Sequence, residues 1–229
     1  MNLQLSRIVL FLLILSKVGY AQTKAIEIKF LGNCGIHMTD GDLNVYVDFP
    51  YKSGAYGYMT YDKSVLDSIT PNAIFIFTHK HADHYSGKLV RKVRKGEHSK
   101  KFTPWRSGKL EKYSQTIPDF DIQALKTKHR FTLKHNSYLI TWHGKKIYLS
   151  GDTEHANIIG GVKGIDWAFI PYWVLKDAKR NNIKIDATKI VLYHLATPQI
   201  PSAKENWGND PTILLLVNQG QVIRIPYAH

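Results

Sequence analysis

The chain has 229 residues, of which 44% are hydrophobic and 21% are charged. This composition fits one globular domain and excludes a disordered, collagen-like or disulfide-stapled chain. Basic residues outnumber acidic ones 31 to 18, which gives a formal net charge of +13. The single cysteine, Cys34, cannot form an intramolecular disulfide or a thiolate zinc site, so we expect any metal to take its ligands from the 11 histidines and from carboxylates.

The N-terminal segment has the pattern of an export signal. Arg7 precedes the apolar run Ile8–Leu15, and Gly19 and Ala21 place small residues where a signal peptidase cleaves. The run is too short to span about 30 Å of hydrocarbon. We therefore predict a signal peptide over residues 1–21 and an exported domain over residues 22–229, periplasmic or secreted and without a membrane span. A buried N-terminal helix is the alternative.

Short apolar segments separated by Gly, Pro, Asn and Asp make up the rest of the chain, and several alternate as half-buried strands do. Residues 138–150 have the pattern of a hairpin that turns at His143-Gly144-Lys145. The predicted strands are residues 25–31, 44–49, 73–78, 122–128, 137–142, 146–150, 167–170, 190–193, 213–217 and 222–225. The predicted helices are residues 64–69, 85–95, 174–181 and 202–207. This order indicates a single β-rich α/β domain.

The densest basic stretch covers residues 88–101 and begins inside a predicted helix. Leu89 and Val93 lie four residues apart, which is the spacing of one buried helix face with basic residues around it. The stretch is either a solvated helix face or a nucleic-acid surface. We favour the solvated face, which leaves nucleic acid as the less favoured partner, because no phosphate loop, zinc finger or RNA-binding signature accompanies it.

A histidine-rich motif, His79-Lys80-His81-Ala82-Asp83-His84, directly follows a predicted buried strand. Side chains on a strand alternate with period two, so His79 and His81 point to one side and can bind one ion. The chain must then turn towards the next helix, and this turn carries Asp83 and His84 towards a second ion. Two histidines for one ion, and a carboxylate with a histidine for the other, are ligands that suit zinc.

This motif resembles the signature of the metallo-β-lactamase superfamily, and the resemblance covers residues 25–227. It implies a four-layer αβ/βα sandwich and a two-metal site completed by a third histidine, a bridging aspartate and a last histidine, each at a strand end. His129, Asp152 and His194 occupy those places in order. Residues 30–35, 47–50 and 164–171 are similar to the branch that contains ascorbate-phosphate lactonase-like proteins.

Three of these assignments have alternatives. His135 also stands near the third-histidine position, and we favour His129 because it ends a strand at the expected distance before Asp152. Asp152 follows a glycine that permits a sharp turn, although an aspartate in this context can also cap a helix. His194 follows an apolar strand and could be a core histidine. Finding all the ligands in register favours the metal site.

The resemblance implies metal-assisted hydrolysis with two zinc ions, although iron or manganese would fit the same ligands. Metal-bound hydroxide would attack an ester, lactone, amide or phosphoester. We assign Asp83 the catalytic role of orienting the nucleophile and passing a proton to the leaving group. Asp48 and Thr127 are candidates for holding the ligand imidazoles in place.

We expect a small-molecule substrate, which the positive charge of the protein suits if the substrate is anionic. The aromatic loop 51–59 and Trp173 are candidates for lining its site. One alternative is a nuclease or phosphodiesterase that uses the basic surface, whose activity would fall steeply with salt. The other is a non-catalytic protein of the same fold that binds metal without turnover.

Overall fold

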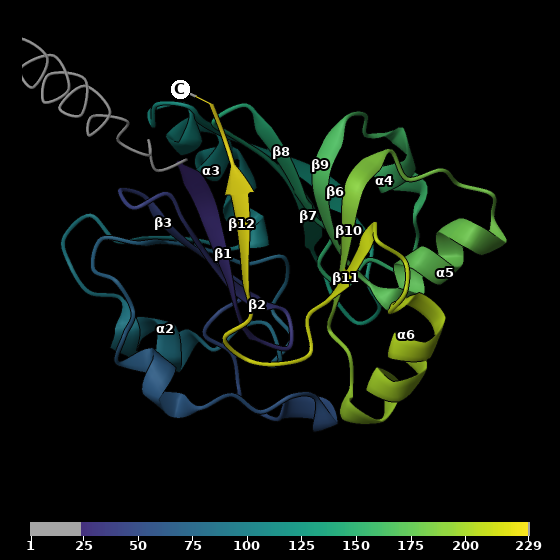
Figure 1. Ribbon diagram of the computed structural model, residues 1–229. Coiled ribbons are helices and arrows are strands. Elements are labelled where there is room, and N and C mark those ends of the chain that lie inside the picture. The colour runs from purple at the N-terminus through teal and green to yellow at the C-terminus, as the bar shows by residue number, and fades with distance from the viewer. Residues whose placement is uncertain (1–23, 229) are drawn as a thin grey trace, which may run out of the picture.

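Two six-stranded sheets face each other, with helices on both outer faces (Figure 1). The protein is represented here by a computed structural model that describes residues 24–228. The predicted signal peptide therefore lies outside the described residues. Among residues 24–228, no helix has the length and apolar character needed to cross a membrane.

The first sheet has the order β12-β1-β2-β3-β4-β5. Its strands are β1 (Ala25–Gly32), β2 (Gly35–Thr39), β3 (Asn44–Val47), β4 (Ile74–Ile76), β5 (Lys100–Phe102) and β12 (Val222–Pro226). The strands β1 to β3 form an antiparallel meander, and β3, β4 and β5 run parallel. The C-terminal strand β12 returns to pair with β1.

The second sheet has the order β11-β10-β9-β8-β7-β6. Its strands are β6 (Phe120–Thr127), β7 (His135–Trp142), β8 (Lys145–Leu149), β9 (Ile165–Pro171), β10 (Ala187–Tyr193) and β11 (Ile213–Leu215). Because β7 is antiparallel to both β6 and β8, and β8 to β11 run parallel, the strands β6, β8 and β10 all end at the same edge of the sheet.

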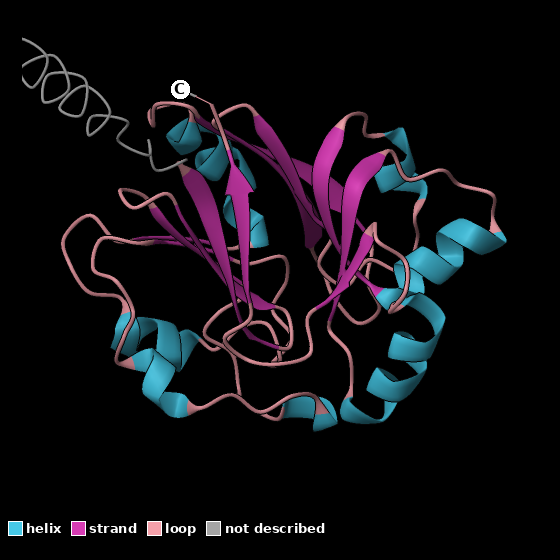
Figure 2. Cartoon of the chain, viewed as in Figure 1, coloured by secondary structure: helices cyan, strands magenta, loops and turns pink. Residues whose placement is uncertain are grey.

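Helices form the outer layers, and strands fill the centre (Figure 2). The helix α2 (Gly87–Val93) and the 3-10 turn η2 (Lys63–Leu66) cover the first sheet. The helices α4 (Asn157–Gly161), α5 (Tyr172–Arg180) and α6 (Ile200–Trp207) cover the second sheet. The helix α3 (Ser107–Ser114) connects β5 to β6. The remaining 3-10 turns are η1 (Ala55–Gly57), η3 (Pro104–Arg106) and η4 (Thr197–Gln199).

The core lies in three apolar layers, all within the described residues. The largest lies between the sheets and includes Ile28, Ile140 and the fully buried Trp142. A second layer packs the second sheet against its helices, and a third packs the first sheet against α2 and η2. Because both faces of the central strands are buried, a strand such as β4 is apolar at every position, as expected for parallel strands between helical layers.

All the predicted strands are present, and the predicted hairpin is confirmed. Trp142 pairs with Lys145, and the two residues between them, His143 and Gly144, have φ angles of 47° and 75°. Positive φ at both positions is the geometry of a type I′ turn, which matches the twist of the strands it connects. Three predicted helices are also found as helices, whereas residues 64–69 contain only the short turn η2.

Four elements were not predicted: β2, β5, α3 and α4. The strand β5 reads Lys-Lys-Phe and has no apolar alternation, because it lies at the edge of its sheet. The helix α4 contains two glycines, which disfavour helix in isolation. These segments take their structure from the sheets that they pack against, so local pattern does not reveal them.

Candidate metal centre

Seven polar side chains meet at the edge where the carboxyl ends of four strands converge. The turn after β4 carries His79, His81, Asp83 and His84, while His129, Asp152 and His194 follow β6, β8 and β10. The structure thus brings together every residue that the sequence predicted as a metal ligand. They form two clusters, and in each cluster one ligand atom per residue lies within 4.8 Å of the others. A further candidate group adds Cys34 to His84 and His194 of the second cluster.

The first cluster consists of His79, His81 and His129. His81 Nδ1 lies 3.2 Å from His129 Nε2. His79 is completely buried, and its Nδ1 lies 3.0 Å from Thr78 Oγ1. Its other ring nitrogen, Nε2, has no hydrogen-bond partner within residues 24–228 although it is buried. A buried nitrogen left without a partner is costly, and a metal ion would satisfy it.

The second cluster consists of Asp83, His84, Asp152 and His194, all of them buried. Asp152 Oδ2 lies 3.0 Å from His84 Nε2 and 3.1 Å from His194 Nε2. Asp83 Oδ2 lies 3.2 Å from the same nitrogen of His194. Two imidazole nitrogens and two carboxylate oxygens converging in this way form a donor set of the kind that zinc and other transition metals take.

Asp152 lies between the two clusters. Its Oδ2 atom is 3.9 Å from His129 Nε2 of the first cluster, as well as being close to both histidines of the second. Its Oδ1 atom is buried and has no hydrogen-bond partner in the described part of the chain. One carboxylate reaching both clusters is the arrangement needed to bridge two ions, which are about 3.5–4 Å apart in two-metal sites.

The electrostatics of the site favour bound cations. Burial raises the pKa of Asp152, but the imidazoles of His194 and His84 outweigh burial and bring the pKa well below its ordinary value. Burial likewise lowers the pKa values of His84 and His194, and Asp152 reverses this by raising both. By contrast, burial lowers the pKa of His79 and keeps its ring neutral. The neutral ring of His79 is in the protonation state that metal binding needs, whereas the raised pKa values of His84 and His194 favour protonated rings, from which a bound metal ion would displace the protons.

Second-layer contacts fix the ligand rings. Asp48 follows β3, and its Oδ2 lies 2.9 Å from His84 Nδ1, so the Nε2 of His84 faces the cluster. The same carboxylate accepts hydrogen bonds from the backbone N–H and the hydroxyl of Thr78. Asp48 therefore lies where the sequence suggested, behind a ligand histidine. Thr127 does not, because its hydroxyl lies 2.6 Å from His135 Nδ1 rather than against a ligand.

His135 takes a supporting position, and His129 belongs to the first cluster. The ring of His135 is buried, and its Nε2 accepts a hydrogen bond from the backbone N–H of Asp152 at 3.0 Å. Burial lowers its pKa to about 3, so the ring is neutral and can accept this bond. His135 is therefore in contact with the turn that carries Asp152.

Two functional contacts were missed in the sequence. The Cys34 Sγ atom lies 3.1 Å from His84 Nδ1, beside Asp48. Glu154 Oε1 lies 3.6 Å from His129 Nδ1 and accepts a hydrogen bond from the Arg130 backbone. Neither residue has a motif spacing that would reveal it. His143, at the hairpin tip, is largely covered and lies 2.8 Å from Asp40 Oδ2.

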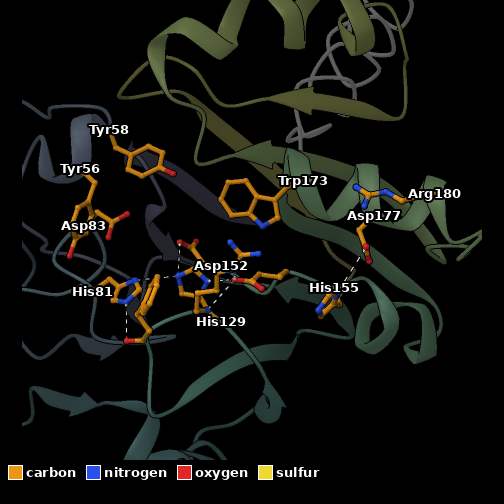
Figure 3. Close-up of a pocket in the computed structure, with 13 residues that line it drawn as sticks. Tyr56, Tyr58, His81, Asp83, His129, Asp152, His155, Trp173, Asp177 and Arg180 are labelled. Carbon is orange, nitrogen blue, oxygen red and sulfur yellow. Dashed lines mark hydrogen bonds and ion pairs between the residues drawn. The ribbon is translucent and has the colours of Figure 1, made fainter.

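A cavity of about 850 Å³ opens onto both clusters (Figure 3). His81, Asp83, His129 and Asp152 lie at one end, and Arg180 lies at the other, beyond Trp173. The residues that line it are Tyr56, Tyr58, His81, Asp83, His129, Arg130, Phe131, Asp152, Glu154, His155, Trp173, Asp177 and Arg180. Two residues of the loop 51–59, together with Trp173, thus take the lining positions that the sequence suggested.

Solved structures resemble this fold, whereas no family model and no curated protein matches the sequence. A candidate metal-dependent hydrolase from Parabacteroides distasonis is 22% identical with a TM-score of 0.62, covering 86% of this chain and 94% of that one. The metallo-β-lactamase fold protein YhfI from Bacillus subtilis is 16% identical with a TM-score of 0.61, covering 88% and 99%. An isothiocyanate hydrolase from gut bacteria of Delia radicum is 14% identical with a TM-score of 0.63, covering 87% and 99%.

The chain therefore has the metallo-β-lactamase fold, a four-layer α/β sandwich in one domain. Identities this low establish the fold and leave the activity to be argued from the site. The donor set fits bound metal, because buried atoms without a hydrogen-bond partner among residues 24–228 include His79 Nε2 in the first cluster and both Asp83 Oδ1 and Asp152 Oδ1 in the second.

Proposed function

We propose that the protein is an exported metal-dependent hydrolase that uses two divalent ions to cleave a small ester, lactone, amide or phosphoester. The observation that carries this proposal is the convergence of two ligand clusters on one carboxylate, Asp152, in the wall of a cavity. A pair of ions in such a site lowers the pKa of water and polarises the bond under attack. Zinc suits the donors best, and iron or manganese fits them too.

Asp83 is the residue to which we assign proton handling. Its Oδ2 atom faces His194, while Oδ1 has no hydrogen-bond partner among residues 24–228. Burial raises the pKa of this carboxyl group, but the hydrogen bond from His194 and the charges of His84 and His194 bring it below its ordinary value. An ionised oxygen beside the cavity can orient a nucleophile, accept its proton and deliver that proton to the leaving group.

The cavity suggests the class of substrate. The ring of Tyr58 packs edge-on against His194, with ring centroids 4.2 Å apart, and the Trp173 ring lies 5.3 Å from the same histidine. Arg130 and Arg180 also line the cavity. Aromatic walls with outlying guanidinium groups suit a small molecule that has an apolar body and an anionic group.

The residues that line the cavity give no support to the nuclease alternative. No residue of the basic stretch 88–101 is among those that line it. Much of that stretch belongs to α2, which packs on the outer face of the first sheet. A non-catalytic metal protein is also a weaker interpretation, because the cavity gives a substrate access to Asp83 and Asp152.

Metal content and hydrolysis test the proposal together. We expect the purified protein to hold about two zinc, iron or manganese ions per chain. His81→Ala and Asp152→Ala should each lower that content, and His143→Ala, which removes a histidine remote from the site, should leave it unchanged. The wild type is then assayed on aryl esters, lactones, phosphodiesters, β-lactams and aryl isothiocyanates, the last because of the similar isothiocyanate hydrolase.

Loss of turnover in the Asp83→Asn and Asp152→Ala variants, at unchanged His143→Ala activity, would support the assignment. A wild-type protein that neither contains metal nor takes up added metal would overturn it. A loaded protein inactive on every substrate would favour the non-catalytic alternative. Activity confined to nucleic acid and abolished by salt would favour the nuclease.

A further inference from the structure

The most exposed apolar side chains of the described residues gather around the metal cavity and the hollow beside it. Phe131 is 97% exposed and Leu133 is 94% exposed, both in the β6–β7 loop (residues 128–134). Tyr56, at 71%, lines the same cavity as Phe131. Leaving such groups in water is unfavourable, and a concentration of them at one place marks an interaction site.

Basic residues surround this apolar tip. Between Asp121 and Asp152 the chain has no acidic residue, while Lys126, Lys128 and Lys134, all exposed, flank the tip. Close by, the Lys80 ammonium group lies 4.5 Å from the ring centroid of Trp105, which is 45% exposed. The surface therefore combines exposed apolar groups with a local excess of positive charge.

A lid over the cavity does not account for this arrangement. Phe131 lines the metal cavity, but Leu133 does not. Leu133 instead lines a neighbouring hollow of about 420 Å³ together with Lys126, Lys128 and Lys134, on the other side of His129. A residue that served only to close over substrate would face the cavity, so Leu133 and the lysines require a different partner.

We propose that the β6–β7 loop docks on an anionic lipid surface, with Phe131 and Leu133 entering the interface and the lysines contacting phosphate headgroups. Interleaved apolar and basic side chains favour such surfaces because apolar burial and attraction to anionic lipid add together. Nucleic acid is the other extended anionic surface that could attract the lysines. It explains the exposed Leu133 less well than lipid does, since an aliphatic side chain cannot stack on bases. Docking would place the mouth of the metal cavity against the lipid surface.

Binding to vesicles tests this proposal without reference to hydrolysis. The chain is used from Gln22 onwards, because residues 8–15 would bind lipid by themselves and because this chain keeps both sheets and all of the core described for residues 24–228. The vesicles contain phosphatidylcholine with about one quarter phosphatidylserine. We expect binding at low ionic strength, weakening as salt is added and absent on pure phosphatidylcholine.

Paired variants locate the binding surface. Phe131→Ser with Leu133→Ser should weaken vesicle binding about tenfold or more, and so should Lys126→Glu with Lys134→Glu. The matched controls are Val222→Ser, an exposed apolar residue elsewhere, and Arg91→Glu with Lys92→Glu, the same charge reversal on α2. Each control should change binding less than about twofold. Unfolding midpoints equal to that of the wild type would show that the variants fold.

Three results would overturn the proposal. Equal losses in the loop variants and in the α2 charge reversal would mean that net charge alone attracts the vesicles. No vesicle binding by the wild type, with binding to an oligonucleotide lost in the lysine variants, would assign the surface to nucleic acid instead. No binding to either would leave the exposed tip without this partner.

Discussion

At the scale of single residues, the candidate site depends on carboxylates that each meet more than one partner. Asp152 reaches histidines of both clusters through one oxygen, and Asp48 holds both His84 and Thr78. Such sharing fixes the rings before any ion binds, which lowers the entropic cost of binding. Asp48 and His194 also have left-handed backbone, with φ of 48° and 57°. Strained backbone of this kind concentrates at functional sites, where the surrounding structure holds side chains in fixed positions.

Asp48→Asn tests the contribution of the second layer. The amide keeps the size of the side chain and removes the charge that orients His84, so we expect metal affinity to fall about 10- to 100-fold. Competition with a chromophoric chelator measures this change. The control is Asp40→Asn, because Asp40 pairs in the same way with His143, a histidine that is not among the clusters. Equal effects of the two changes would contradict a specific role for Asp48.

At the scale of elements, strand ends and tight turns present the ligands. Gly151 lies in the turn after β8 with φ of +58°, and a Cβ there would lie 2.7 Å from Thr78 Cβ and 2.8 Å from His135 Nε2. The turn therefore needs a glycine for two reasons, its backbone conformation and its lack of a side chain. This close approach is what lets His135 accept the backbone N–H of Asp152.

Gly151→Ala should destabilise the protein more than Gly144→Ala does. Both glycines have positive φ, but a Cβ at Gly144 would meet nothing within 4 Å. Alanine at Gly144 should cost about 1 kcal/mol for the backbone alone, and at Gly151 about 3 kcal/mol, because the turn must also move away from Thr78 and His135. Urea unfolding measures both. Similar costs at the two positions would show that crowding at Gly151 is relieved at little energetic expense.

At the scale of the whole molecule, the site exists only where the two sheets meet. The first cluster joins the turn after β4, in one sheet, to the end of β6 in the other, and the second cluster joins the same turn to the ends of β8 and β10. Metal ions would therefore link the two halves of the sandwich. Because the unfolded chain does not hold these ligands together, bound metal should stabilise the folded state.

Removal of metal should lower the thermal unfolding midpoint. With free metal at about 1,000 times its dissociation constant, linkage gives about 4 kcal/mol, or about 10 °C for a domain of this size. Differential scanning calorimetry with and without chelator measures the shift. Asp152→Ala should show a much smaller one. If the chelator leaves the unfolding midpoint of the wild type unchanged, the result would contradict the proposal that bound metal links the two sheets.

Sequence patterns predicted much of the site because metal ligands obey local rules. The period of a strand places His79 and His81 on one side, and a glycine before Asp152 marks a sharp turn. The choice of His129 over His135 came from its place at a strand end, and His129 is the one that lies in a ligand cluster.

The sequence by itself determined the α/β class and most of the strands, because periodicity and turn chemistry act between near neighbours. The identity and order of the candidate ligands came from the histidine-rich motif and from its resemblance to the metallo-β-lactamase superfamily. Only the tertiary structure decided which atoms meet. Cys34 beside His84, Glu154 beside His129 and the shared position of Asp152 all join residues from separate elements. Their contacts follow from how two sheets pack face to face, and the physical reason is that such packing is fixed by the whole core and not by any short segment.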